Sequence, residues 1–217
     1  LSTRSILCSE FVDGVEVDTF LDAPQELRNR IGSLLISLCF KELFEFKLMQ
    51  TDPNPANYLY DESRDIMNLI DLGAGRDFEQ GFLDSYMHII WGAFQDDKQA
   101  ILQNSFDIGF LTGDENREMF NAQYKGTMIV GEPFRTAPGE LYDFGQARIT
   151  AKVHTILPTL SKHRLTPPPQ EVYSLHKKII GSYLMCIKLR AQVPARAILE
   201  ETYARWHELH GPAFYES

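Results

Sequence analysis

The stretch MQTDPNPANYLYDESRDIMNLIDLGAG, residues 49–75, sets two short apolar runs between acidic and turn-forming residues. Asp52 opens a loop rich in Pro and Asn, and Asn57 follows five positions later. Residues 58–60 and 67–70 are rich in strand-forming side chains and are separated by an Asp-Glu-Ser-Arg turn. This strand, turn and strand lead to Asp71, which precedes Leu72 and Gly73. The pattern predicts two carboxylates and one amide around a small β-hairpin.

Phosphoryl transfer uses such a set of groups. One carboxylate orients or deprotonates the attacking hydroxyl, while an amide oxygen and a second carboxylate hold Mg²⁺ against the phosphates. Kinase-like folds carry the first group and the amide as D-x-x-x-x-N and the second carboxylate in D-F-G; here the sequences are DPNPAN and DLG. An isolated Asp-Pro-Asn is usually only a turn, but the joint spacing after a helix favours catalysis. We therefore predict Asp52 as the catalytic carboxylate and Asn57 and Asp71 as metal ligands.

A second string in the sequence tests this interpretation, because Asp143-Phe144-Gly145 spells D-F-G literally. It follows a Pro-Gly-Glu turn rather than an apolar strand, and it lies 91 positions after Asp52. We predict that this string is a surface turn and not a metal site.

Composition excludes several other classes of function. The formal net charge is −9 over 217 residues, which disfavours nucleic acid as a partner because phosphate binding relies on Lys and Arg. The three cysteines lie far apart and form no C-x-x-C pair, so neither a disulfide framework nor a zinc knuckle is predicted. The six histidines have no H-x-x-x-H spacing and are predicted to lie at the surface or at helix ends. The basic clusters at 161–164 and 176–178 are predicted to be solvated, with anionic lipid headgroups as the alternative partner.

Hydrophobic periodicity predicts a mainly helical chain. A strand is predicted over residues 5–12, and a long helix opens at Pro24 and continues toward Phe46. Residues 47–49 form a further strand candidate. Later helices are predicted from about Glu79 to Phe94, and then at 120–129, 148–160, 171–190 and 194–209. No apolar run is long enough to span a bilayer.

Three segments together carry a resemblance to a known family. MQTDPNPANYLYD, NLIDLGAGRDF and LTPPPQEVYSLHKKIIGSYLMCIKLRA resemble the UbiB/ADCK family of atypical kinases, in particular its eukaryotic mitochondrial branch that supports coenzyme Q biosynthesis. In that branch the catalytic loop reads Q-T-D-P-N-W-x-N, so Gln50 through Asn54 and Asn57 match, whereas Pro55 replaces the usual Trp. The resemblance implies a kinase-like large lobe over residues 14–217, with residues 1–13 as the last small-lobe strand and the hinge.

The resemblance also implies roles for residues near the start of the chain. Ser9 would be the gatekeeper, and Glu10, Val12 and Asp13 would form the hinge that meets the adenine of ATP. The family's K-x-G-Q motif and Ala-rich nucleotide loop do not occur in these 217 residues. We therefore expect the chain to be a large-lobe fragment whose small lobe is absent, with weak nucleotide binding and negligible turnover by itself.

The functional expectation is an ATP- and Mg²⁺-dependent kinase or ATPase in coenzyme Q biosynthesis. The resemblance implies a location on the matrix side of the inner mitochondrial membrane, with coenzyme Q biosynthetic proteins and lipid precursors as partners. It leaves open peripheral membrane contact and a homodimer. No A-P-E signature follows Gly73, so no platform for a protein substrate is predicted. Two alternatives remain: a non-catalytic interaction module of the same family, and a small-molecule kinase of the aminoglycoside or choline type.

Overall fold

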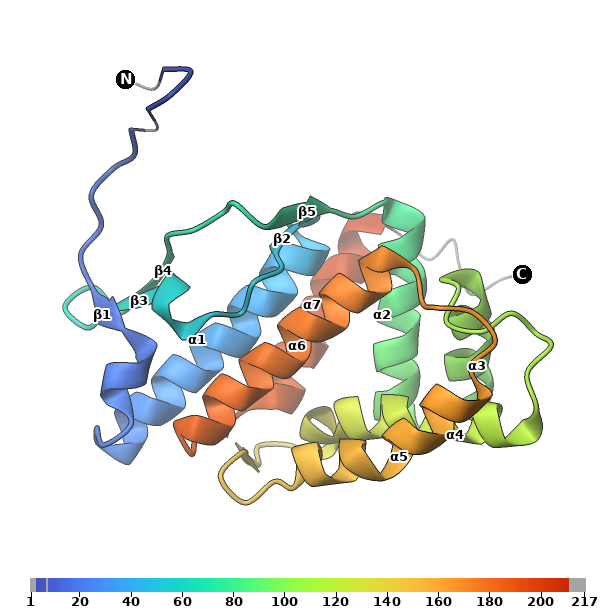
Figure 1. The fold of residues 1–217 in the computed structure, drawn as a ribbon. Coiled ribbons are helices and arrows are strands. Elements are labelled where there is room, and N and C mark those ends of the chain that lie inside the picture. Colours follow the sequence, from blue (N-terminus) through green and yellow to red (C-terminus); the bar gives the residue numbers. More distant parts are fainter. Residues whose placement is uncertain (1–2, 7, 211–217) are drawn as a thin grey trace.

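The computed structural model describes residues 3–6 and 8–210, and helices dominate this part of the chain (Figure 1). They are α1 (Gln25–Phe44), α2 (Gln80–Gln95), α3 (Lys98–Asp107), α4 (Arg117–Val130), α5 (Ile149–His163), α6 (Gln170–Lys188) and α7 (Ala195–His210). Single 3₁₀ turns add η1 (Val17–Phe20), η2 (Pro55–Asn57) and η3 (Glu132–Arg135). The prediction of a mainly α fold is confirmed. None of the helices in the described ranges is both long and apolar enough to span a bilayer.

Three small antiparallel sheets join the helices. The central strand β3 (Tyr58–Asp61) pairs with β1 (Val15–Glu16) and with β4 (Ile66–Leu69). Strand β2 (Leu48–Gln50) pairs with β5 (Gly75–Asp77), and β6 (Tyr142–Asp143) pairs with β7 (Gln192–Val193). Gln50 lies opposite Gly75 in one pair, and Tyr58 lies opposite Leu69 in the other. These two registers bring the connecting loops, 51–57 and 70–74, alongside each other.

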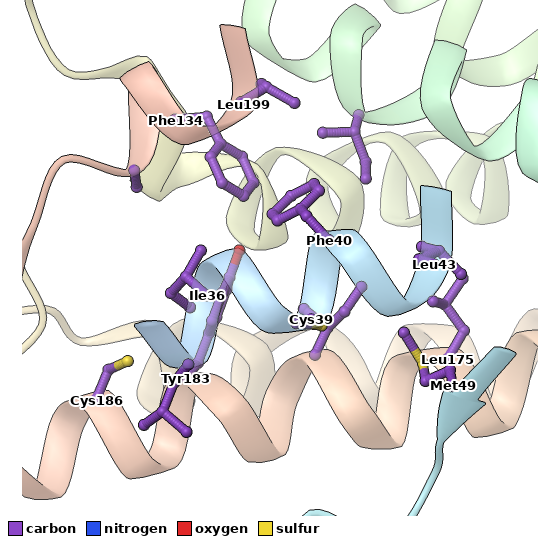
Figure 2. Close-up of a cluster of buried hydrophobic side chains, with 14 of the residues drawn as sticks. Ile36, Cys39, Phe40, Leu43, Met49, Phe134, Leu175, Tyr183, Cys186 and Leu199 are labelled. Atoms are coloured by element: carbon purple, nitrogen blue, oxygen red, sulfur yellow. The ribbon is translucent and has the colours of Figure 1, made fainter. Parts of the chain in front are cut away.

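The hydrophobic core lies between α1, α6, α7 and η3 (Figure 2). Phe40 of α1 stacks on Phe44, with ring centroids 5.8 Å apart, and meets the ring of Phe134 edge-on at 5.4 Å. Tyr183 of α6 is buried in the same cluster, and its hydroxyl donates to the Val130 carbonyl. Helix α1 therefore forms the centre of the lobe, and β2 and the loop after it extend directly from its end.

The start of the chain differs from the sequence prediction. Residues 3–6 and 8–14 form no strand in the structure, while residue 7 of the predicted segment lies outside the described residues. Figure 1 shows this segment running away from the helices. A strand needs a neighbour that completes its backbone hydrogen bonds, and within the described ranges the first residues with such a neighbour are Val15 and Glu16.

The structure differs from the sequence predictions in two further places. Helix α3 was not predicted, although Asp97 supplies a standard N-cap signal by accepting a hydrogen bond from the Ala100 amide. The Asp143-Phe144-Gly145 string does lead into a turn, with Asp143 ending β6 and Gly145 exposed, but it is not wholly at the surface: Phe144 is completely buried against Tyr142 and Tyr183. The Pro-Gly-Glu turn does precede it, but the turn ends before the string begins, and the aromatic side chain is free to enter the core.

Candidate active site

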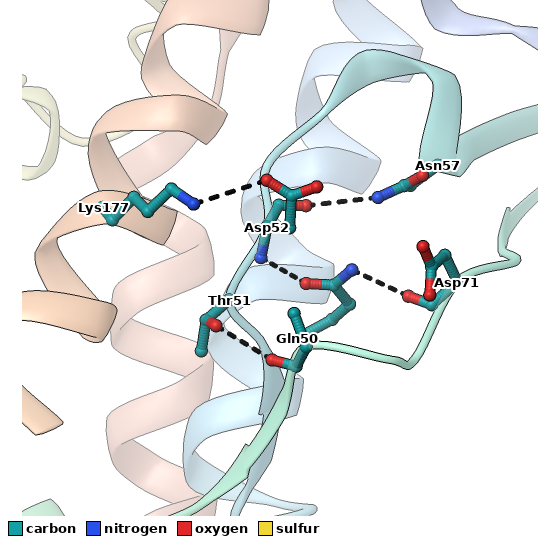
Figure 3. Close-up of polar contacts among 7 residues, drawn as sticks. Gln50, Thr51, Asp52, Asn57, Asp71 and Lys177 are labelled. Carbon is teal, nitrogen blue, oxygen red and sulfur yellow. Dashed lines mark hydrogen bonds and ion pairs between the residues drawn. The ribbon is translucent and has the colours of Figure 1, made fainter.

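The candidate site consists of the two loops that the paired hairpins bring together (Figure 3). Gln50, at the end of β2, connects them: its Nε2 donates to the Asp71 carbonyl at 2.8 Å, and its Oε1 accepts from the Asp52 amide. Thr51 adds a second connection, because its amide and its hydroxyl both donate to the Ala74 carbonyl, at 3.0 and 2.8 Å. Asp52 and Asp71, which are nineteen positions apart in the sequence, thus belong to one polar network.

A buried ion pair supports this network from below. Lys178 of α6 lies 2.6 Å from the Glu42 carboxylate of α1, with side chains only 1% and 5% exposed. The other carboxylate oxygen of Glu42 accepts from the Gln50 amide at 2.9 Å. Burial alone would lower the pKa of Lys178, but the neighbouring Cys39, Tyr58 and Glu42 side chains raise it above the ordinary value, and the Glu42 carboxylate is the one in direct contact. The ammonium therefore stays charged and links two core helices to the catalytic loop.

The orientations of Asn57 and Asp71 suit a metal ion. Asn57 is buried and its Nδ2 points to the Asp52 carbonyl at 3.5 Å, while its Oδ1 accepts no hydrogen bond from the residues that the structure describes. One carboxylate oxygen of Asp71 accepts from the Gly73 amide at 2.7 Å, and the other has no hydrogen bond to the described residues. An amide oxygen and a carboxylate oxygen are ligands that Mg²⁺ prefers, so the residues present fit this ion.

Gly73 lies in the turn that the hydrogen bond from the Gly75 amide to the Leu72 carbonyl closes at 3.0 Å. Its φ is not in the left-handed region, so a turn does not require glycine here. A Cβ at this position would instead lie 3.0 Å from the Asp71 carboxylate. Glycine therefore leaves room for the hydrogen bond between the Gly73 amide and Asp71.

Helix α6 also contacts the catalytic loop directly. Lys177 lies 3.4 Å from the Asp52 carboxylate (Figure 3), and both side chains are about half exposed, at 49% and 44%. Pro53 packs so closely on Gly181 that a Cβ at Gly181 would overlap the proline ring. These contacts fix the distance between the loop and α6, and no local sequence pattern indicates them because they join residues more than a hundred positions apart.

The basic clusters are not simply solvated faces. Consecutive residues on a helix point about 100° apart, so His176, Lys177 and Lys178 reach three different environments. Burial, with a smaller contribution from nearby Arg164, lowers the pKa of His176 to about 4, Lys177 meets Asp52, and Lys178 is in the core. In the other cluster, His163 pairs with Glu118 at 3.0 Å. The prediction that all six histidines lie at the surface or at helix ends is wrong for His176 and for His88, which is half-buried in the middle of α2, where burial lowers its pKa.

The predicted hinge residues lie apart from the network. Ser9, Glu10 and Asp13 are exposed and Val12 is half-buried. The segment is fastened by the Asp13 carbonyl, which accepts from Asn68 of β4 at 2.9 Å. In the described part of the chain, no hydrogen bond or ion pair joins these residues to Asp52 or Asp71. Over residues 3–6 and 8–210, no three His, Cys, Asp or Glu side chains cluster closely enough to hold a metal ion, although the amide of Asn57 does not belong to that set of residue types.

Comparisons with known proteins show which proteins this chain resembles. Residues 1–105 match the family described as the ABC1 atypical kinase-like domain. The chain is 41% identical over 206 residues to "Atypical kinase COQ8B, mitochondrial" of Rattus norvegicus, covering 95% of this chain and 39% of that protein. It is 33% identical over 203 residues to "Atypical kinase COQ8, mitochondrial" of Saccharomyces cerevisiae, covering 94% of this chain and 40% of that protein. The chain thus spans about two fifths of the length of these relatives.

A solved structure shares the fold. A chain in the complex of Rv3197 with erythromycin from Mycobacterium tuberculosis superposes with a TM-score of 0.66 at 20% identity, covering 89% of this chain and 48% of that one. This likeness concerns the fold alone. Together with the family match, it confirms the prediction of a kinase-like large lobe.

Proposed function

Because the chain belongs to the UbiB family of atypical kinases, we propose that it forms the catalytic large lobe of an ATP- and Mg²⁺-dependent enzyme that supports coenzyme Q biosynthesis. The observation that carries the proposal is the Gln50 bridge, which holds the Asp52 amide and the Asp71 carbonyl on one side chain. A structural turn alone would not need the two carboxylate loops in fixed relation. The division into residues 1–13 and 14–217 is part of the proposal.

Each site residue has a defined task in this proposal. Asp52 accepts the proton of the attacking hydroxyl or water, and the ammonium of Lys177 keeps its carboxylate turned toward α6 until an acceptor arrives. Asn57 and Asp71 hold Mg²⁺, which would neutralise charge on the transferring phosphoryl group. Glu10, Val12 and Asp13 contact the adenine in the hinge. The acceptor is a small molecule or water, since no A-P-E segment is present to bind a protein.

The cellular setting is also proposed from the relatives. Both COQ8 proteins are named mitochondrial, and we place this protein on the matrix side of the inner membrane, in peripheral contact with lipid precursors and coenzyme Q biosynthetic proteins. A homodimer is compatible with this setting. The enzyme proposal and the alternative of a non-catalytic interaction module predict opposite outcomes for one substitution, Asp71→Asn.

The test is rescue of coenzyme Q production in cells that lack the endogenous protein, using full-length protein with Asp71→Asn at matched abundance. A neutral amide cannot replace an anionic Mg²⁺ ligand, so the enzyme proposal expects no rescue. Asp71 is exposed, and within the described residues its carboxylate forms a hydrogen bond only with the Gly73 amide of its own loop, so the unfolding temperature should stay within about 2 °C of wild type. Full rescue by this variant would leave the interaction module as the function.

A further inference from the structure

A cavity of about 170 Å³ lies between α1, α2, α4, α5 and α6, away from the two carboxylate loops. Its wall is predominantly apolar and includes Phe40, Ile90, Ala122, Ile156 and Ile179. Cys39 and Tyr183, labelled in Figure 2, border the same space. An apolar cavity of about 150 Å³ is large enough to bind benzene, so this one accommodates a small apolar molecule.

One cation reaches this apolar wall. Arg164 follows the end of α5 and lines the cavity, and its Nη1 is buried without a hydrogen-bond partner. Its guanidinium forms no ion pair with the residues that the structure describes. A buried N–H group of this kind is costly unless something accepts from it. The cavity therefore has an unused, positively charged donor at its edge.

The ionisable side chains His176 and Cys39, which also line the cavity, carry no charge that could balance the Arg164 guanidinium. Burial holds the pKa of His176 near 4 and raises that of Cys39 to about 12, so both are neutral at physiological pH. Glu115 is the carboxylate that acts on Arg164 from nearby. Its oxygens already accept from the amides of Thr112 and Gly113 and from the Thr112 hydroxyl. Glu115 thus eases the burial of Arg164 without occupying its free Nη1.

The wall formed by α5 offers a way in. Ile149 is the buried residue of this helix, whereas Val153, Ile156 and Leu160 are half-buried and Leu157 is 45% exposed. The helix packs chiefly on α4 (Figure 1).

We propose that this cavity binds an amphipathic monocarboxylate, with its apolar body among the α1, α2, α4 and α6 side chains and its carboxylate on Arg164. The volume limits the body to about one aromatic ring or a chain of about eight carbons. The site is separate from the phosphoryl-transfer residues and requires neither ATP nor metal. Its test is therefore independent of the proposed enzymatic function.

The experiment is calorimetric titration of residues 1–217 with octanoate below its micelle concentration, beside the neutral 1-octanol. Wild type should bind octanoate at least about tenfold more tightly than 1-octanol, because a charge-assisted hydrogen bond contributes more than a neutral one. Arg164→Gln should lose that difference and keep its affinity for 1-octanol. Lys162→Gln removes an exposed charge two positions earlier and should change neither affinity.

A second variant tests the location. Ala122→Leu places three more carbons in the cavity and should weaken both ligands by at least about tenfold. Each variant is compared with wild type by circular dichroism and thermal unfolding before titration. No octanoate binding by wild type, equal octanoate binding by Arg164→Gln, or undiminished binding by a folded Ala122→Leu would each overturn the proposal.

Discussion

The side chain of Gln50 forms hydrogen bonds with both loops of the candidate site. It therefore explains how the loops are held together, which neither carboxylate does. Sequence motifs identified Asp52, Asn57 and Asp71 because kinase-like chemistry fixes their spacing. They did not show how residues 50 and 71 meet, since that depends on the pairing of β2 with β5. The sequence motifs thus select the residues of the candidate site, whereas the hydrogen bonds that connect their loops depend on strand pairing that no local motif shows.

We expect Gln50→Leu to loosen both loops while the helical core stays folded. Two hydrogen bonds are lost, at about 0.5–1.5 kcal/mol each. Amide hydrogen exchange should quicken in residues 51–57 and 70–74 but not in α1. The matched control is Gln99→Leu, because Gln99 is exposed on α3. Unchanged exchange in the two loops would show that Gln50 does not hold them.

The Glu42 and Lys178 pair gives a prediction about stability. Lys178→Met should cost about 3–5 kcal/mol because it leaves a buried carboxylate without its partner. The double variant Glu42→Gln with Lys178→Met should recover much of that loss, since glutamine can still accept from the Gln50 amide. Urea unfolding at pH 7 measures both. A double variant as unstable as the single one would contradict this account.

His176 predicts how stability changes with acid. Its folded pKa of about 4 lies below the ordinary value of 6.5, so the unfolded chain takes up a proton first as the pH falls. The stabilisation is present above pH 6.5 and is lost progressively between pH 6.5 and 4, by up to about 3 kcal/mol. His176→Phe should remove this component. Urea unfolding of both proteins at pH 7.5 and 4.5 should therefore show a smaller acid-induced loss for the variant.

At the scale of elements, the chain was most predictable where periodicity is strong. Helices α1, α2 and α6 follow apolar spacings of three and four residues, and the hairpin of β3 and β4 follows its turn residues. Residues 5–12 have equally strand-like side chains, but they find no pairing partner in the described structure. Helix α3 carries polar residues on much of its surface and buries only Ile101 and Ser105, which is why periodicity did not indicate it.

Helix α6 sets the position of the catalytic loop through Gly181. Gly181→Ala would force Pro53 away from the helix and move the adjacent Asp52, so we expect a loss of activity in the full-length protein of at least about tenfold. Gly81→Ala is a close control, because a Cβ there has nothing within 4 Å and alanine favours a helix by up to about 1 kcal/mol. Equal activity of the two variants would refute a role for this contact.

At the scale of the whole molecule, the proposed function makes this lobe one side of a nucleotide site. The network around Gln50 can hold Mg²⁺ ligands, but the 217 residues contain no K-x-G-Q motif to contact the phosphates. The sequence predicted this division of tasks by resemblance. It could not predict the apolar cavity, because packing defects arise from side chains on five helices whose relative placement no local pattern encodes.

The last prediction concerns nucleotide binding by the lobe alone. Residues 1–217 should bind Mg-ATP at least about tenfold more weakly than the same residues preceded by the small lobe of a COQ8 relative, since phosphate contacts supply much of the affinity. Calorimetry on both proteins measures the difference. Asp71→Asn should abolish the metal-dependent part of binding, whereas Asp143→Asn, in the second D-F-G string, should leave it intact because Asp143 pairs with Gln192 at a separate sheet. Robust ATP hydrolysis by residues 1–217 would contradict the prediction, and it would show that one lobe carries enough phosphate contacts for turnover.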